Sequence, residues 1–157
     1  MDEWTIVRSL ALRIGAEGDA RLGRALDNWA DTHADWLGLT DARDWNAACE
    51  VLARAPDMGP TPHMLAVTDV LAQSLTLEAF DAALLRMLVA VDRLPRVAAL
   101  ARLWSEHGRD LPGLLGEMAG ASTLEADRAV RRSAALRLGL VTFSVNRQGV
   151  VEVDIRW

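Results

Sequence analysis

The spacing of the apolar residues changes once along this chain, close to Gly139. Up to about residue 138 they recur every three or four residues, which is the period of an α-helix with one buried face. After Gly139 they alternate with polar residues in two short runs, separated by a turn at residues 146–149. The pattern predicts a mainly α protein, a helical bundle followed by a winged-helix domain with a C-terminal β-hairpin. The apolar residues of the hairpin are Val141, Phe143, Val145, Val151, Val153 and Ile155.

Apolar stripes predict the individual helices, which cover residues 4–14, 22–36, 45–52, 64–75, 80–91, 97–104 and 111–118 and the segment after Ser122. Three prolines and a glycine within residues 56–62 interrupt this pattern, because proline does not continue a helix. They predict a boundary between an N-terminal helical segment (1–57) and a second segment (62–157). We expect the second segment to merge into a winged-helix domain over about residues 95–157, since three helices and a hairpin follow in that order.

The charged residues exclude some functions. All seventeen basic residues are arginine, so the chain has no lysine for a Schiff base or for a phosphate-binding P-loop. The net charge of −5 argues against non-specific nucleic-acid binding by the whole chain, since that binding depends on neutralising phosphates. The charge is uneven, however. Residues 122–157 hold six arginines and four acidic residues (+2), whereas residues 1–121 hold eleven arginines and eighteen acidic residues (−7).

Five arginines lie in this basic part, on or near the helix expected after Ser122 and in the turn of the hairpin. They are Arg128, Arg131, Arg132, Arg137 and Arg147. In one interpretation they contact the phosphates and bases of DNA, as the recognition helix and wing of a winged helix do. In the other they form a solvated face that pairs with acidic groups. Asp127, Glu152 and Asp154 are close to them in sequence and would repel a phosphate backbone, which favours the second interpretation.

Aromatic residues are the second group of candidates. Trp29, His33 and Trp36 are spaced so that they share one face of a helix. Such a stripe either forms a cleft for a ligand or packs the helix against its neighbours with His33 at the exposed edge, and helical aromatic stripes usually belong to the core. A recruiting surface needs apolar anchors with a polar rim. We expect Trp4, Trp36 and Trp45 to be partly exposed anchors for a protein partner.

The remaining features predict a protein without catalytic residues, metal or cofactor. Cys49 is the only cysteine, so the chain has no internal disulfide and no cysteine-based zinc site. No histidines stand at metal-ligand spacing, and no nucleophile, base and orienting group occur in a recognisable order. The acidic start is unlike a signal peptide, and no apolar run approaches the roughly 18 residues of a membrane span. We therefore expect a cytoplasmic protein with no membrane partner.

Three stretches resemble the region that precedes the ATPase core in a group of bacterial AAA+ ATPases. They are LTLEAFDAALLRMLVAVDRLPRV (75–97), LPGLLGEMAG (111–120) and SAALRLGLV (133–141). In that family an aliphatic helical segment leads into a winged helix, which closes with a phrase similar to Ser-Pro-Leu-Arg-Arg-Leu-Gly-Leu. Ala134 and Ala135 occupy the stretch where the family has proline. The matching residues here are Ser133, Leu136, Arg137, Leu138, Gly139 and Leu140.

The resemblance implies a non-catalytic N-terminal region of an AAA+ ATPase, which recruits a substrate or adaptor protein and regulates the ATPase. Its partners are then a protein and an ATP-binding core downstream in the parent chain, and the sequence is either an excised region or a free-standing relative. One alternative is a winged-helix transcriptional regulator that binds DNA through the five arginines. Another is a two-domain sensor with a ligand cleft between the tryptophan stripe and the winged helix.

Overall fold

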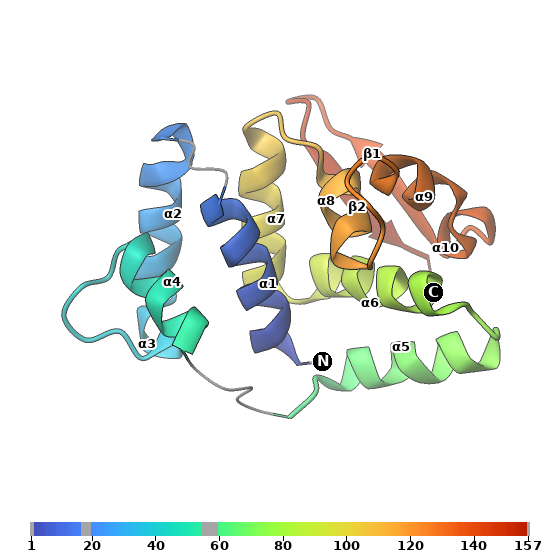
Figure 1. Ribbon diagram of the computed structural model, residues 1–157, viewed down its shortest axis with the longest axis horizontal. Helices are drawn as coiled ribbons and strands as arrows, with labels where there is room; N and C mark the ends of the chain where they lie inside the picture. Colours follow the sequence, from blue (N-terminus) through green and yellow to red (C-terminus); the bar gives the residue numbers. More distant parts are fainter. Residues whose placement is uncertain (1, 17–19, 55–59, 157) are drawn as a thin grey trace.

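The computed structural model describes residues 2–16, 20–54 and 60–156 (Figure 1). Within these ranges the chain is mainly α with a C-terminal β-hairpin, as the change in apolar spacing predicts. The elements are α1 (Glu3–Ala16), α2 (Ala20–Thr32), α3 (Ala34–Leu37), α4 (Trp45–Arg54), α5 (His63–Ser74), α6 (Ala79–Arg93), α7 (Pro95–Glu106), α8 (Leu111–Met118), α9 (Ala126–Arg132), α10 (Ala134–Arg137), β1 (Val141–Val145) and β2 (Val151–Ile155). None of the described helices is long and apolar enough to cross a membrane.

Helices α6 and α7 form the centre of the molecule (Figure 1). On one side α1 and α2 pack against α7, and on the other side α8, α10 and β2 pack against α6. One cluster of buried apolar side chains includes residues that precede positions 55–59 in the sequence and residues that follow them. The boundary predicted between residues 57 and 62 falls largely outside the described residues, and the two flanking segments share this core.

Two helix starts follow from local chemistry that the sequence shows. Pro95 occupies the first turn of α7, where its missing N–H group would have no helical partner in any case. Asp110 precedes α8, and its carboxylate accepts a hydrogen bond of 3.1 Å from the Gly113 amide. These signals set where the two helices begin.

Two other predicted helices differ from the structure. The stripe over residues 22–36 is not one helix, because the chain divides at His33 into α2 and α3. The helix expected directly after Ser122 begins only at Ala126. Residues 122–125 form a turn instead, in which the Glu125 amide donates to the Ser122 carbonyl at 3.0 Å. The expected helix start directly after Ser122 is therefore wrong.

A further break at Ser133 separates α9 from α10. Ser133 has an extended backbone (ψ 151°), and its hydroxyl accepts a hydrogen bond of 3.4 Å from the Leu136 amide. The Ala134 amide donates to the Asp81 carboxylate of α6 at 2.8 Å, which fixes the start of α10 to the central helix. The helix expected to carry the arginines is thus two short helices, of seven and four residues.

The hairpin has the predicted strands and turn. Val141 pairs with Ile155 and Val145 pairs with Val151 in an antiparallel register. Gly149 closes the turn with a φ of 82°, in the left-handed region that favours glycine. Strand β2 contacts α6 and α7, and the Val151 amide donates to the Ser105 hydroxyl of α7 at 2.7 Å. The helical core therefore holds the hairpin through β2.

Helices α8 and α9 approach each other closely at Gly116. A β-carbon at this position would lie 2.7 Å from the Ala126 carbonyl oxygen and 2.9 Å from a methyl group of Val130. Only a residue without a side chain fits there without displacing backbone. This contact sets the distance between α8 and α9, the two helices that lie beneath the hairpin.

Candidate functional site: a groove beneath the hairpin

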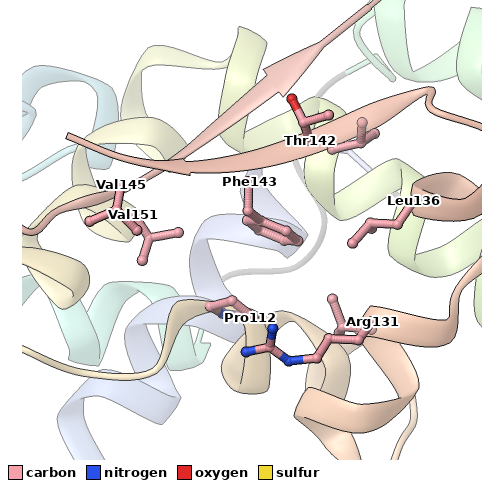
Figure 2. Close-up of a pocket in the computed structure, with 9 residues that line it drawn as sticks. Pro112, Arg131, Leu136, Thr142, Phe143, Val145 and Val151 are labelled. Carbon is pink, nitrogen blue, oxygen red and sulfur yellow. The ribbon is translucent and has the colours of Figure 1, made fainter.

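A half-open groove of about 450 Å³ lies between the hairpin and helices α8 and α9 (Figure 2). Figure 2 shows Phe143 in the roof, pointing toward Pro112 and Arg131 in the floor. The lining is apolar except for Arg131 and Thr142. Its residues are Pro112, Val130, Arg131, Leu136, Val141, Thr142, Phe143, Val145 and Val151.

The groove exists because the apolar face of the hairpin is longer than the surface that covers it. At the base of the hairpin, Val141 and Ile155 are buried in the core (1% and 8% exposed). Toward the turn, Val145 on the same face is 67% exposed. Apolar side chains on one face of a strand are normally covered by the core. The outer half of this face is available to a ligand.

The two edges of the hairpin differ. The amides of Asn146 and Arg156 donate across the hairpin to the carbonyls of Val150 and Leu140, at 3.0 Å in both cases. Bonded and non-bonded pairs alternate along an antiparallel ladder, so the amide groups of Phe143 and Val145 face away from β2. Within the described part of the chain, no hydrogen bond to either outward amide is found. Strand β1 thus has an open edge beside the groove, while the edge of β2 is engaged by α7.

The five candidate arginines are all exposed, but the structure brings only one of them into the groove. Arg131 lines the floor, and its guanidinium also donates to the Asp127 carboxylate at 2.8 Å. Arg128 and Arg132 lie on α9, Arg137 lies on α10, and Arg147 lies in the turn of the hairpin. They belong to separate elements and do not form one continuous helix face.

Sequence reasoning did not find the apolar residues of the groove as candidates. The sequence predicts Phe143 and Val145 only as residues of the hairpin, and Pro112 only as part of the helix over residues 111–118. One signal was present in the sequence: all six residues on one face of the hairpin are apolar. What the sequence does not show is that the core covers only the base of this face.

Two of the three candidate tryptophans are more deeply buried than expected. Trp4 and Trp45 are 5% and 8% exposed, so the expectation that they are partly exposed anchors is wrong. Trp36 is half-buried, with its ring 4.9 Å from that of Trp4 and the guanidinium of Arg96 at 4.6 Å. Aromatic rings stabilise a fold more when they are buried between helices than when they are exposed to water. Trp4 and Trp36 join α1 to α3, Trp36 and Arg96 join α3 to α7, and Trp45 joins α4 to α2 through the Trp29 ring.

His33 lies at the edge of this aromatic cluster, with its ring 4.9 Å from the Trp29 ring. Partial burial lowers the pKa of His33 below its ordinary value, and the positive charge of Arg96 lowers it further, while Glu3 acts in the opposite direction. The folded protein therefore binds a proton at His33 less readily than the unfolded chain does.

We expect the free energy of unfolding to fall as the pH is lowered below about 6.5, the ordinary histidine value. The sign follows from the lowered pKa: His33 is neutral in both states above this value, and below it the unfolded state takes up a proton first. Urea unfolding at a series of pH values measures the slope. His33→Gln should show a smaller decrease than the wild type, and an identical decrease in both would contradict this account.

The structure bears on two kinds of reactive chemistry, that of the Cys49 thiol and that of a bound metal ion. Burial raises the pKa of the Cys49 thiol to about 11, so it is protonated near neutral pH and is a poor nucleophile. In the described ranges, no three histidine, cysteine or acidic side chains come together in a way that could hold a metal ion. The groove is the feature with the clearest binding chemistry.

A second apolar surface lies on α5. This helix packs chiefly against α6, through buried Leu65, Thr68 and Ala72. Its outer face exposes Met64, Val67 and Val70 to 44%, 46% and 62%. These three side chains lie outside the groove beneath the hairpin.

Comparison with protein-family models, with curated proteins and with solved structures gives no match to this chain.

Proposed function

We propose that this chain is the non-catalytic, winged-helix N-terminal region of a cytoplasmic AAA+ ATPase and that it recruits a substrate or adaptor protein. The observation that carries the recruitment role is the apolar groove beside the open edge of β1. A groove of about 450 Å³ lies within the usual range of ligand sites, about 300 to 1,000 Å³. Its apolar lining with one guanidinium suits a protein segment that has both apolar and acidic side chains.

The order of the elements supports the winged-helix part of the proposal. Helix α7 is followed by α8, a turn, α9 with α10, and the hairpin, which is the order of a winged helix. The phrase that resembles the family has defined positions in this unit. Ser133 caps α10, and Gly139 has a φ of 68° that turns the chain from α10 into β1. Leu136 and Leu140 are partly buried against the core.

The same geometry gives less support to DNA binding. A recognition helix presents several side chains to the major groove, but α9 has only seven residues and ends at Arg132. The Arg131 guanidinium already pairs with Asp127. Glu152 and Asp154 are exposed on the hairpin and would face the phosphates that a wing contacts.

A DNA titration separates the two functions. We expect the anisotropy of a fluorescein-labelled, random-sequence duplex to remain unchanged when the protein is added at about 50 mM salt. Saturable binding that weakens steeply with salt, and that weakens further in Arg131→Ala/Arg132→Ala, would instead support a DNA-binding regulator. The matched control is Arg24→Ala/Arg54→Ala, which removes two exposed arginines from the acidic part of the chain.

The ATPase part of the proposal is tested by the coding sequence beyond residue 157. A P-loop motif with its lysine after a short linker is the expected result. A stop codon directly after residue 157 would contradict it and would leave the recruitment role to a free-standing protein.

A further inference from the structure

We propose that helix α5 of one copy of this chain binds in the groove beneath the hairpin of a second copy, and that the chain thereby self-associates head to tail. The inference goes beyond the proposed function, because it concerns contacts between copies of the chain. It joins two apolar surfaces that the single molecule leaves uncovered, the outer face of α5 and the lining of the groove. A helix that lays an apolar face in a groove is a recurring mode of protein recognition.

The first support is that α5 is apolar on two faces. Leu65 and Ala72 are buried on the face that packs against α6. Met64, Val67 and Val70 are exposed on the outer face, at positions three residues apart that are neighbours on a helix surface. A helix with apolar residues on all sides is normally buried on all sides. The outer face of α5 therefore has the composition of an interface.

The second support is that neither surface carries a charge in need of a new partner. Asp69 is the one acidic or arginine residue of α5, and it pairs with Arg86 of α6. Arg131 is the one charged residue in the lining of the groove, and its guanidinium already donates to the Asp127 carboxylate. Burial of an unpaired charge is the main cost that prevents apolar surfaces from joining. That cost is small for this pair of surfaces.

The third support is the match in size and position. The twelve residues of α5 extend over about 18 Å, and the five residues of β1 in the roof of the groove extend over about 17 Å. Helix α5 packs on the side of α6 that faces away from the hairpin (Figure 1). A chain therefore cannot place its own α5 in its own groove while this packing is intact. The occupant is α5 of a second copy.

This contact is heterologous, because the two copies contribute different surfaces. Since the two surfaces lie on opposite sides of α6, one pair of copies cannot make both contacts at once (Figure 1). Each pair keeps one free groove and one free α5, so association continues beyond two copies until a ring closes or a filament forms. A contact through one helix face is small, and we expect association at about 10 µM to 1 mM.

Sedimentation velocity over this concentration range tests the association of the whole chain. We expect the average mass to rise with concentration and to exceed that of two copies. Salt at about 0.5 M should not dissociate the assemblies, because the contact is apolar and salt screens the repulsion between copies of net charge −5. A chain that stays monomeric over the whole range would overturn the inference.

Two variants test the two surfaces separately. Val67→Lys adds a charge to α5 and Val145→Lys adds one to the groove, both at exposed residues where the fold should be retained. Each variant alone should associate about tenfold more weakly than the wild type or worse, because a charge would enter an apolar contact. An equimolar mixture should form 1:1 pairs, since the intact α5 of one variant fits the intact groove of the other. The matched control is Leu12→Lys, at a similarly exposed residue of α1, and it should associate like the wild type.

The outcomes separate this contact from other modes of association. Unchanged association of Val145→Lys would indicate pairing of α5 with α5, and unchanged association of Val67→Lys would indicate pairing between hairpins. Either result would overturn the inference, as would a mixture that stays monomeric. If a variant does not fold, the wild-type series decides, and assembly that stops at two copies counts against the inference. Absence of self-association leaves the recruitment role standing, whereas saturable DNA binding removes that role and leaves this contact in place.

Discussion

Replacing Leu88 by alanine is expected to lower the free energy of unfolding by about 2–5 kcal/mol. Leu88 lies on the central helix α6 and is fully buried, at 0% exposure. Its removal takes away apolar contacts and leaves a cavity, because the helices packed around α6 can close only part of the space. For a domain of this size such a loss is a large fraction of the total stability.

Urea unfolding followed by circular dichroism measures this effect. The matched control is Leu124→Ala, which makes the same chemical change at a residue that is 97% exposed. We expect the control to change the free energy of unfolding by about 0.5 kcal/mol or less. Similar effects in the two variants would show that Leu88 does not pack in a tightly filled core.

The second large effect is expected at Gly116. Gly116→Ala should destabilise the protein by about 1–3 kcal/mol, because the new methyl group would overlap the Ala126 carbonyl oxygen of α9. Backbone atoms cannot move aside as the end of a flexible side chain can. The two helices must separate, which also changes the floor of the groove.

The same substitution at Gly23 is expected to have the opposite sign. Gly23 lies inside α2, and a β-carbon there would meet nothing within 4 Å. Alanine should therefore stabilise the helix by about 0.5–1 kcal/mol, since it loses less backbone entropy on folding than glycine. Thermal unfolding of both variants checks the pair. If Gly116→Ala also raised the melting temperature, the close approach of α8 and α9 would be wrong.

Much of the fold could be predicted from the period of the apolar residues. The strands over residues 141–145 and 151–155 and the turn between them match the expected hairpin. The breaks at His33 and Ser133 could not be predicted in this way, because apolar residues continue through both positions at helical spacing. The break at Ser133 depends on a hydrogen bond between the Ala134 amide and Asp81, which is 53 residues away in the sequence.

The candidate site could be predicted only in part. The arginines were recognised by their charge, and the structure shows all five exposed. The expected exposure of Trp4 and Trp45 is wrong because the sequence gives residue type and spacing but not depth, and both residues lie inside the core. The groove depends on how far α8 and α9 extend under the hairpin. That distance is a property of packing between helices, and no local pattern encodes it.

The attachment of α5 chiefly to one neighbour makes the stability of the molecule uneven. An element joined to the rest through a single interface can open while the remaining core stays folded, at a free-energy cost below that of complete unfolding. Opening of α5 would uncover Leu65 and the side of α6 that it covers, and would leave the hairpin and its groove in place. The structure thus predicts a cooperative centre and an outer helix whose opening costs less free energy than complete unfolding.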